Sequence, residues 1–175
     1  MYKRQSQGWG TVEQILDPVY ASNAFYDKLV KVKDYLTRPL TEVAQDVQRS
    51  AAPTAYAQHE DEAQPLAAAL TGSAPATLVC RLAQPSTRPA STAVGTALKA
   101  EFGIEPVVSG RTVTAAADGA TAWAIASWAV ARGDALGVID VDADGRSWTR
   151  ADPQAWPNAI PPTTGSVVIT LAATP

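Results

Sequence analysis

The chain has 175 residues, 46% of them hydrophobic, and a net charge of −3 at pH 7. This length suits one domain or two small ones, and the acidic balance gives no sign of the clustered basic surface on which nucleic-acid binding usually depends. The chain also contains no apolar run near the roughly 18 residues that cross a membrane. We therefore expect neither a nucleic-acid partner nor a membrane span.

Helical signals fill residues 1–72. The TVEQ segment that begins at Thr11 fits a capping box, in which the threonine hydroxyl accepts a hydrogen bond from a first-turn amide and the Gln14 side chain reaches back. Asp17 and Pro18 then supply the N-cap and the first-turn proline of a second helix. This helix places four apolar residues on one stripe: Ala21, Phe25, Leu29 and Val32.

Two further helices are predicted in the same region. One begins near Thr41 and is stopped by Pro53, because proline cannot continue a helix. The other runs over residues 54–70 towards Gly72, with Pro65 as a kink or restart. The inward face of the first of them should consist of Leu40, Val43, Ala44 and Val47.

Beyond this helical part the pattern changes twice. Residues 73–91 include the QPSTRPAST stretch, which is rich in Pro, Ser and Thr and predicts a linker. Residues 92–175 predict a small domain in which a helix packs on an antiparallel or mixed sheet, so the fold class is α+β. Its expected elements are a helix over 92–102 closed by Gly103, a strand over 106–117, a helix over 119–137, a hairpin over 138–149 and a strand over 166–173.

One acidic motif resembles half of a calcium-binding loop. Asp140, Asp142 and Asp144 before Gly145 match the first ligands of an EF-hand loop. Position twelve of that loop, where a bidentate glutamate should close the site, is Ala151. The Asp-Gly pair between alternating residues instead predicts a hairpin turn, and we expect no metal site.

The single histidine and the single cysteine do not form a catalytic pair. His59 lies among acidic neighbours on a polar helix face, which predicts a solvated side chain and excludes a nucleophilic triad. Cys80 has two interpretations: a buried small hydrophobic residue, or a thiol whose partner lies outside this chain. No pattern typical of a cofactor-binding loop is present, so no cofactor is expected.

Five tryptophans stand out in the composition. Trp123 and Trp128 lie in an alanine-rich helix and should pack the core of the second domain. Trp148 and Trp156 are expected to shield one face of the hairpin. Trp9 stands between two glycines. Its ring has two equally supported interpretations: it binds a ligand such as a sugar, or it packs inside the protein.

From Ser6 to Leu82 the chain resembles a family of actinobacterial envelope proteins of largely unknown function, whose N-terminal half is similar to lysozyme-like lytic transglycosylases. Three motifs carry the resemblance in the family's order and spacing: SQGWGT, DPVYA and QRSAAPTAYA. Family members usually place GLFQQRP and a helix with an acidic glutamate before SQGWGT, where this chain has MYKRQ. The resemblance implies a partial lysozyme-like domain over residues 1–72, in a chain that is truncated at its N-terminus.

The resemblance also implies a function. Gln7, Trp9 and Tyr56 would line one wall of a groove for peptidoglycan glycan. The upstream part of the family would supply the catalytic acid and a partner for Cys80, so no catalytic residue is assigned and we expect the chain to bind without cleaving. The protein would be secreted or part of the cell envelope, although residues 1–14 lack the apolar stretch of a signal peptide.

None of the carboxylates in this sequence is expected to act as the catalytic acid. Glu13 and Glu42 lie in first helical turns, where they complement the helix dipole. The acidic side chains of residues 60–62 look solvated. The alternative function is a non-catalytic protein-interaction module of the envelope, in which the second domain binds a protein partner and the helices form a spacer.

Overall fold

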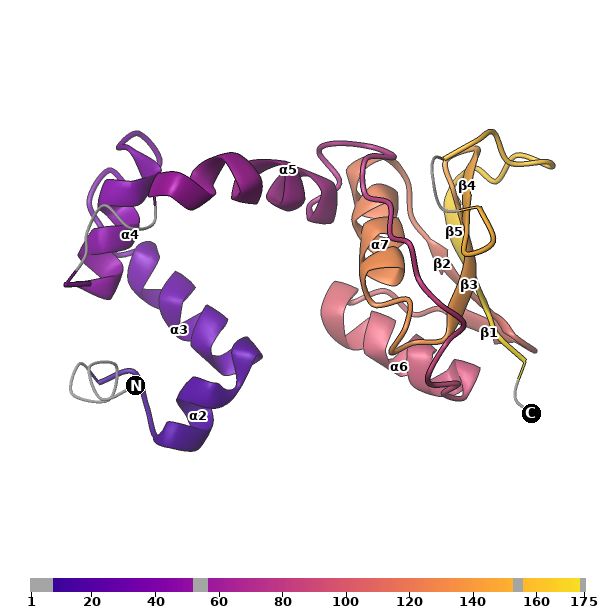
Figure 1. Ribbon diagram of the computed structural model, residues 1–175, viewed down its shortest axis with the longest axis horizontal. Coiled ribbons are helices and arrows are strands. Elements are labelled where there is room, and N and C mark those ends of the chain that lie inside the picture. Colours follow the sequence, from indigo (N-terminus) through magenta and orange to yellow (C-terminus); the bar gives the residue numbers. More distant parts are fainter. Residues whose placement is uncertain (1–7, 52–56, 153–155, 174–175) are drawn as a thin grey trace. The chain divides into compact units, whose positions relative to one another are not determined.

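The computed structural model describes residues 8–51, 57–152 and 156–173 (Figure 1). The chain forms two compact units, with the boundary between Asp61 and Glu62 rather than near residue 72. Helices and a five-stranded antiparallel sheet occur together in the described ranges, so the fold is a mixed one that is compatible with the α+β class. None of the helices there combines the length and the apolar character that crossing a membrane requires.

The first unit is helical where it is described. Its elements are α2 (Val12–Leu16), α3 (Pro18–Leu29), α4 (Leu40–Gln48) and the 3-10 turn η1 (Ala57–His59). The capping box of α2 is confirmed: the Gln14 amide donates to the Thr11 hydroxyl at 3.3 Å, and the Thr11 amide donates to the Gln14 side chain at 2.9 Å. Asp17 caps α3 by accepting from the Val19 amide at 2.8 Å, with Pro18 in the first turn, as predicted.

Helix α4 differs in part from its prediction. Val43 and Val47 are buried, but Leu40 is 55% exposed and does not face inward. The helix ends at Gln48, before Pro53, because Arg49 adopts a left-handed conformation with φ of 48°. The predicted stripe of α3 is partly rather than fully buried, so the interior of this unit is small.

The second unit is a sheet with helices on one face (Figure 1). Its strands are β1 (Val107–Ser109), β2 (Thr112–Ala116), β3 (Val138–Ala143), β4 (Arg146–Thr149) and β5 (Ser166–Leu171), in the order β1-β2-β5-β3-β4. Helix α5 (Glu60–Leu70) begins at the end of the first unit and continues into the second, and the helices that pack on the sheet are α6 (Ser91–Phe102) and α7 (Gly119–Ala131). Helix α6 contacts β1 and β2, and α7 contacts β3 and β5, so the two helices share the covered face.

Three predicted elements of this unit can be compared with the structure. The single strand expected over 106–117 is wrong, because Gly110, at φ of 56°, turns the chain into the antiparallel pair β1 and β2. Helix α7 ends at Ala131, and a turn rather than helix leads to Gly137. The Asp144-Gly145 hairpin is confirmed, with φ of 47° and 75° at the two turn residues.

The core lies between the sheet and its two helices. Strand residues alternate between buried and partly exposed positions, as a sheet with one covered face requires. Trp123 and Trp128 are 4% and 6% exposed, which confirms their place in the core. Trp148 is fully buried, and Trp156 packs edge-to-face on Trp123 with ring centroids 5.2 Å apart.

The segment expected to be a linker, residues 73–91, is hydrogen-bonded to the second unit. The Ser86 amide and hydroxyl donate to the Asp134 carboxylate at 3.0 Å and 2.6 Å. The Leu78 carbonyl accepts from the Trp156 indole at 3.0 Å. Cys80 packs partly buried against the core, and this burial raises the pKa of its thiol. Residues 73–91 are therefore a bonded part of the second unit rather than a free linker.

Candidate functional site

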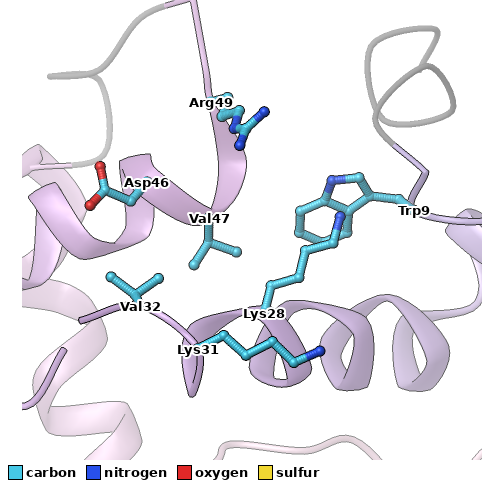
Figure 2. Close-up of a pocket in the computed structure, with 7 residues that line it drawn as sticks. All are labelled: Trp9, Lys28, Lys31, Val32, Asp46, Val47 and Arg49. Carbon is cyan, nitrogen blue, oxygen red and sulfur yellow. The ribbon is translucent and has the colours of Figure 1, made fainter. Parts of the chain in front are cut away.

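A hollow of about 590 Å³ lies beside Trp9 in the first unit (Figure 2). We call it the Trp9 groove. Its walls come from the loop before α2, from the end of α3 and from the end of α4. The lining residues are Trp9, Lys28, Lys31, Val32, Asp46, Val47 and Arg49.

Two glycines place the tryptophan in this groove. Gly8 and Gly10 have φ of 70° and 125°, which side chains rarely tolerate. A Cβ on Gly10 would lie 2.8 Å from the Gln14 side-chain oxygen and 2.9 Å from the Tyr20 hydroxyl. The loop can therefore close on the capped start of α2 only with glycine there, which accounts for the GWG pattern.

Trp9 is packed rather than open. Its side chain is 5% exposed, and the Lys28 ammonium lies 4.1 Å from the centroid of its ring. A cation at this distance over an indole is attracted by the ring quadrupole. A sugar could stack on this face only after the ammonium had moved aside.

Positive charge gathers around the groove. Lys28 and Lys31 lie three residues apart on the last turn of α3 and just beyond it, and Arg49 follows the last residue of α4. Partial burial lowers the pKa of Lys28, and the nearby charges of Arg49 and Lys31 lower it further. The lowered pKa of Lys28 indicates that the charges of Arg49 and Lys31 are close enough to act on its ammonium.

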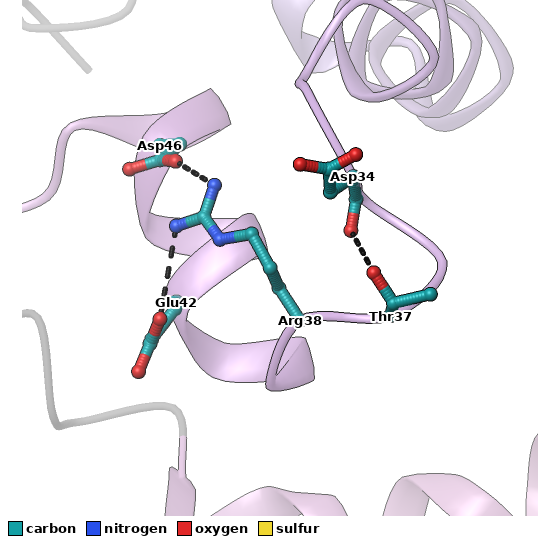
Figure 3. Close-up of polar contacts among 5 residues, drawn as sticks. All are labelled: Asp34, Thr37, Arg38, Glu42 and Asp46. Atoms are coloured by element: carbon teal, nitrogen blue, oxygen red, sulfur yellow. Dashed lines mark hydrogen bonds and ion pairs between the residues drawn. The ribbon is translucent and has the colours of Figure 1, made fainter.

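Asp46 is the carboxylate among the described lining residues, and it forms an ion pair with Arg38, which does not line the groove (Figure 3). Arg38 donates to Asp46 at 2.8 Å and lies 3.7 Å from Glu42, and these carboxylates raise the pKa of the guanidinium. The turn before α4 is held by Thr37, which donates to the Asp34 carbonyl at 3.2 Å. In Figure 2 the Asp46 carboxylate points away from Trp9 and Lys28. The groove is therefore positively charged on balance.

Of the three residues predicted to bind glycan, the structure describes one. Trp9 lines the groove, whereas Gln7 and Tyr56 lie outside the described residues. The sequence interpretation missed Lys28, Lys31 and Arg49. The spacing of the two lysines on one helix face was the available signal, but nothing in the sequence places Arg49 opposite them.

The remaining sequence candidates have structural roles. The pKa of Glu13 is lowered by hydrogen bonds from the backbone and from Thr11, which is opposite to the shift that a proton donor needs. His59 is exposed, 3.4 Å from the Gln58 side chain. In the described part of the chain, no three His, Cys, Asp or Glu side chains converge as a metal site.

A second hollow, of about 420 Å³, lies on the second unit beside β3. Asp140 lines it, and burial followed by the nearby charge of Asp142 raises the pKa of this carboxyl to about 6, against a smaller opposing effect of the Ser147 hydroxyl. Asp140 and Asp142 lie on the face of the sheet opposite the core, because side chains alternate along a strand and Val141 between them is buried. The half calcium motif is thus part of a hairpin.

We expect Asp140→Asn to stabilise the protein at neutral pH. The pKa of Asp140 is raised in the folded parent protein. The contribution of this carboxyl to the free energy of unfolding is therefore fully present below pH 4 and is lost as the pH rises towards and through 6. Allowing for partial contact with water, the loss should be about 1–2 kcal/mol. Urea unfolding at a series of pH values measures it. The loss should vanish in Asp140→Asn and shrink in Asp142→Asn; an unchanged pH dependence in both would contradict the assignment.

Comparison of the chain with protein-family models, with curated proteins and with solved structures finds no match. The resemblance of residues 6–82 to the lysozyme-like envelope family therefore stays a prediction. The chemistry of the site follows from the residues that line the Trp9 groove.

Proposed function

We propose that the first unit binds the glycan of peptidoglycan at the Trp9 groove, as part of a secreted or envelope protein of the lysozyme-like kind. The observation that carries the proposal is the groove itself. It is concave, it has an aromatic wall, and it has charged hydrogen-bond donors at its rim, which is the usual make-up of a small-ligand site. The resemblance carried by the SQGWGT loop supplies the class of ligand.

The groove suits an amino sugar in two ways. Val32, which is half-buried, offers apolar surface to the C–H groups of a sugar ring, and the Trp9 ring adds to this surface once the Lys28 ammonium moves aside. The ammonium and guanidinium groups at the rim carry only hydrogen-bond donors, which match hydroxyl and acetamide oxygens. A repeating sugar can make both kinds of contact along the same opening.

The proposed function is binding without cleavage. Hydrolysis of a glycoside requires a carboxylic acid whose pKa is raised so that it can protonate the leaving oxygen. In the first unit, Asp46 is bound by Arg38 and the pKa of Glu13 is lowered. The carboxyl with a clearly raised pKa, Asp140, belongs to the other unit.

Co-sedimentation with purified, insoluble peptidoglycan tests this function. The protein should pellet with the cell-wall material and leave its turbidity unchanged. Lys31→Gln should weaken sedimentation several-fold, because it removes a charged hydrogen-bond donor from the rim of the groove. Lys33 is exposed and lies outside the groove, so Lys33→Gln should leave sedimentation unchanged. Protein that stays in the supernatant would contradict binding, and clearing of the suspension would contradict its non-catalytic character.

A second candidate is the protein-interaction module, and one observation favours it. Several apolar side chains of the first unit are exposed, among them Leu16 at 60%, Val19 at 69% and Leu36 at 82%. Exposed apolar surface of this kind often marks a contact with another protein. This candidate would be favoured if the protein does not bind peptidoglycan but forms a stable complex with an envelope protein.

A further inference from the structure

We propose that the sheet face opposite α6 and α7 docks a lysine side chain of a partner protein, with the hollow of about 420 Å³ beside β3 as the pocket for its ammonium and stem. We call this pocket the Asp140 hollow. Its lining includes Asp140, Asp142, Ser147, Asn158, Ile160 and Thr163. The hollow lies in the second unit, so the proposal does not depend on glycan binding at the Trp9 groove.

The two aspartates lie on the face of the sheet that points away from the core. Helices α6 and α7 pack on the other face (Figure 1). The strand register places Asp140 between Thr170 and Thr149, and it places Asp142 opposite Ser147. All five side chains are partly exposed. This face is therefore polar, open to solvent in part, and carries two adjacent carboxylates.

The negative charge of this face is not neutralised within the described part of the chain. Neither Asp140 nor Asp142 forms an ion pair there. Arg146 starts from the core side of the sheet, because it pairs with the buried Ala143, and it donates to the Trp156 carbonyl at 3.1 Å. Burial and then the charge of Asp142 raise the pKa of Asp140 to about 6. A cation between the two carboxylates would relieve their repulsion.

The loop before β5 holds the other wall of the hollow in place. The Gly145 amide donates to the Thr163 carbonyl at 2.6 Å, and the Gly145 carbonyl accepts from the Ala159 amide at 2.8 Å. The Ser147 amide donates to the Pro157 carbonyl at 2.9 Å. The hairpin and the loop are thus bonded together at several points. Such a preformed pocket reduces the entropic cost of binding.

The chemistry of the hollow fits an ammonium on an apolar stem. Residues two apart on a strand lie about 7 Å apart, so Asp140 and Asp142 can accept hydrogen bonds from one ammonium placed between them. An ammonium has three donors, and Asn158 or Thr163 can supply the third acceptor. Ile160, which is 95% exposed, offers apolar surface to the methylenes of the stem. The planar fork of an arginine matches a single carboxylate instead.

The rim of the hollow favours a protein over a free amine. A small-ligand site normally buries most of its ligand. Pro157, Ile160 and Pro161 line the hollow but are themselves exposed. Exposed apolar residues beside a polar pocket provide contact area for the neighbouring residues of a protein chain. The lysine would therefore enter the hollow while its own chain covers the rim.

An NMR titration of the whole chain with Nα-acetyl-lysine methylamide at neutral pH tests the proposal. The backbone amide signals of Asp142, Ser147 and Ile160 should shift. Nε-acetylation of the probe removes its charge and should weaken binding about tenfold, and Asp142→Asn should weaken binding of the charged probe by a similar factor. Asp144→Asn is the matched control. Asp144 is exposed in the hairpin turn and does not line the hollow, so its replacement should change the affinity less than about twofold.

Ile160→Ser tests the contact with the stem. It should weaken binding of the lysine probe several-fold and leave binding of methylammonium, which has no stem, unchanged. Equal binding of the charged and acetylated probes would overturn the proposal, and so would undiminished binding by both Asp142→Asn and Asp140→Asn. Tighter binding of calcium chloride or of the corresponding arginine probe at the same signals would contradict the choice of lysine. Shifts caused by n-pentylamine but not by the lysine probe would assign the hollow to a small amine and overturn docking of a protein.

Discussion

Replacing Arg150 by methionine is expected to destabilise the second unit by about 3–5 kcal/mol, because it removes a buried guanidinium and its charge-assisted hydrogen bonds to three carbonyls. Arg150 is 8% exposed. Its guanidinium donates to the carbonyls of Val138 at 2.8 Å and Gly133 at 2.7 Å, and also to that of Ala83. One side chain thus joins the start of β3, the turn after α7 and the segment that precedes α6.

Urea unfolding followed by tryptophan fluorescence measures this effect, since four tryptophans lie in the core of the same unit. Arg111→Met is the matched control: its side chain is exposed, and the change should cost no more than about 0.5 kcal/mol. A loss below about 1 kcal/mol in Arg150→Met would show that the three carbonyls find other donors and that the segment does not depend on this residue.

Gly72→Ala should have an effect of similar size for a different reason. Gly72 has φ of 76°, and a Cβ there would lie 1.8 Å from the Ala120 carbonyl oxygen and 2.8 Å from the Ala124 amide nitrogen. These are backbone atoms of the first turns of α7 and cannot rotate away. We expect a loss of at least about 3 kcal/mol, made up of the left-handed strain and the displacement of the backbone.

Gly103→Ala separates these two contributions. Gly103 has φ of 69°, close to that of Gly72, but a Cβ there meets no atom within 4 Å. Its substitution should cost only the conformational strain of about 1–2 kcal/mol. Equal thermal shifts for the two variants would mean that the close approach of Gly72 to α7 contributes nothing to stability.

The elements that the sequence predicts well depend on neighbours in the chain. The capping box at Thr11, the Asp17 cap and the Asp144-Gly145 turn each involve groups within a few residues of one another. The interactions that stabilise these elements are formed within a short segment, so a sequence pattern is enough to predict them. The left-handed Gly103 at the end of α6 is of the same kind.

The elements that the sequence misjudges depend on distant partners. A stretch rich in Pro, Ser and Thr predicts a linker, but Ser86 and Thr87 bond to Asp134, which lies nearly fifty residues further along. The exposure of Leu40 likewise follows from which residues pack beside α4 and not from its helical spacing. Composition carries no information about such contacts.

The candidate site divides in the same way. The GWG pattern identifies Trp9, because its two glycines have a local conformational reason. The cations do not stand out, since Lys28 and Arg49 approach each other only when α3 and α4 have packed. The charge of the groove is therefore a property of the tertiary structure.

The most direct test of glycan binding at the Trp9 groove is an NMR titration of the indole N–H resonances with muramyl dipeptide. The five tryptophans should give five such signals, and Trp9→Phe identifies one of them. We expect the Trp9 signal to shift with ligand while the four signals from the buried core of the second unit stay in place. A stationary Trp9 signal, or shifts among the other four instead, would contradict it.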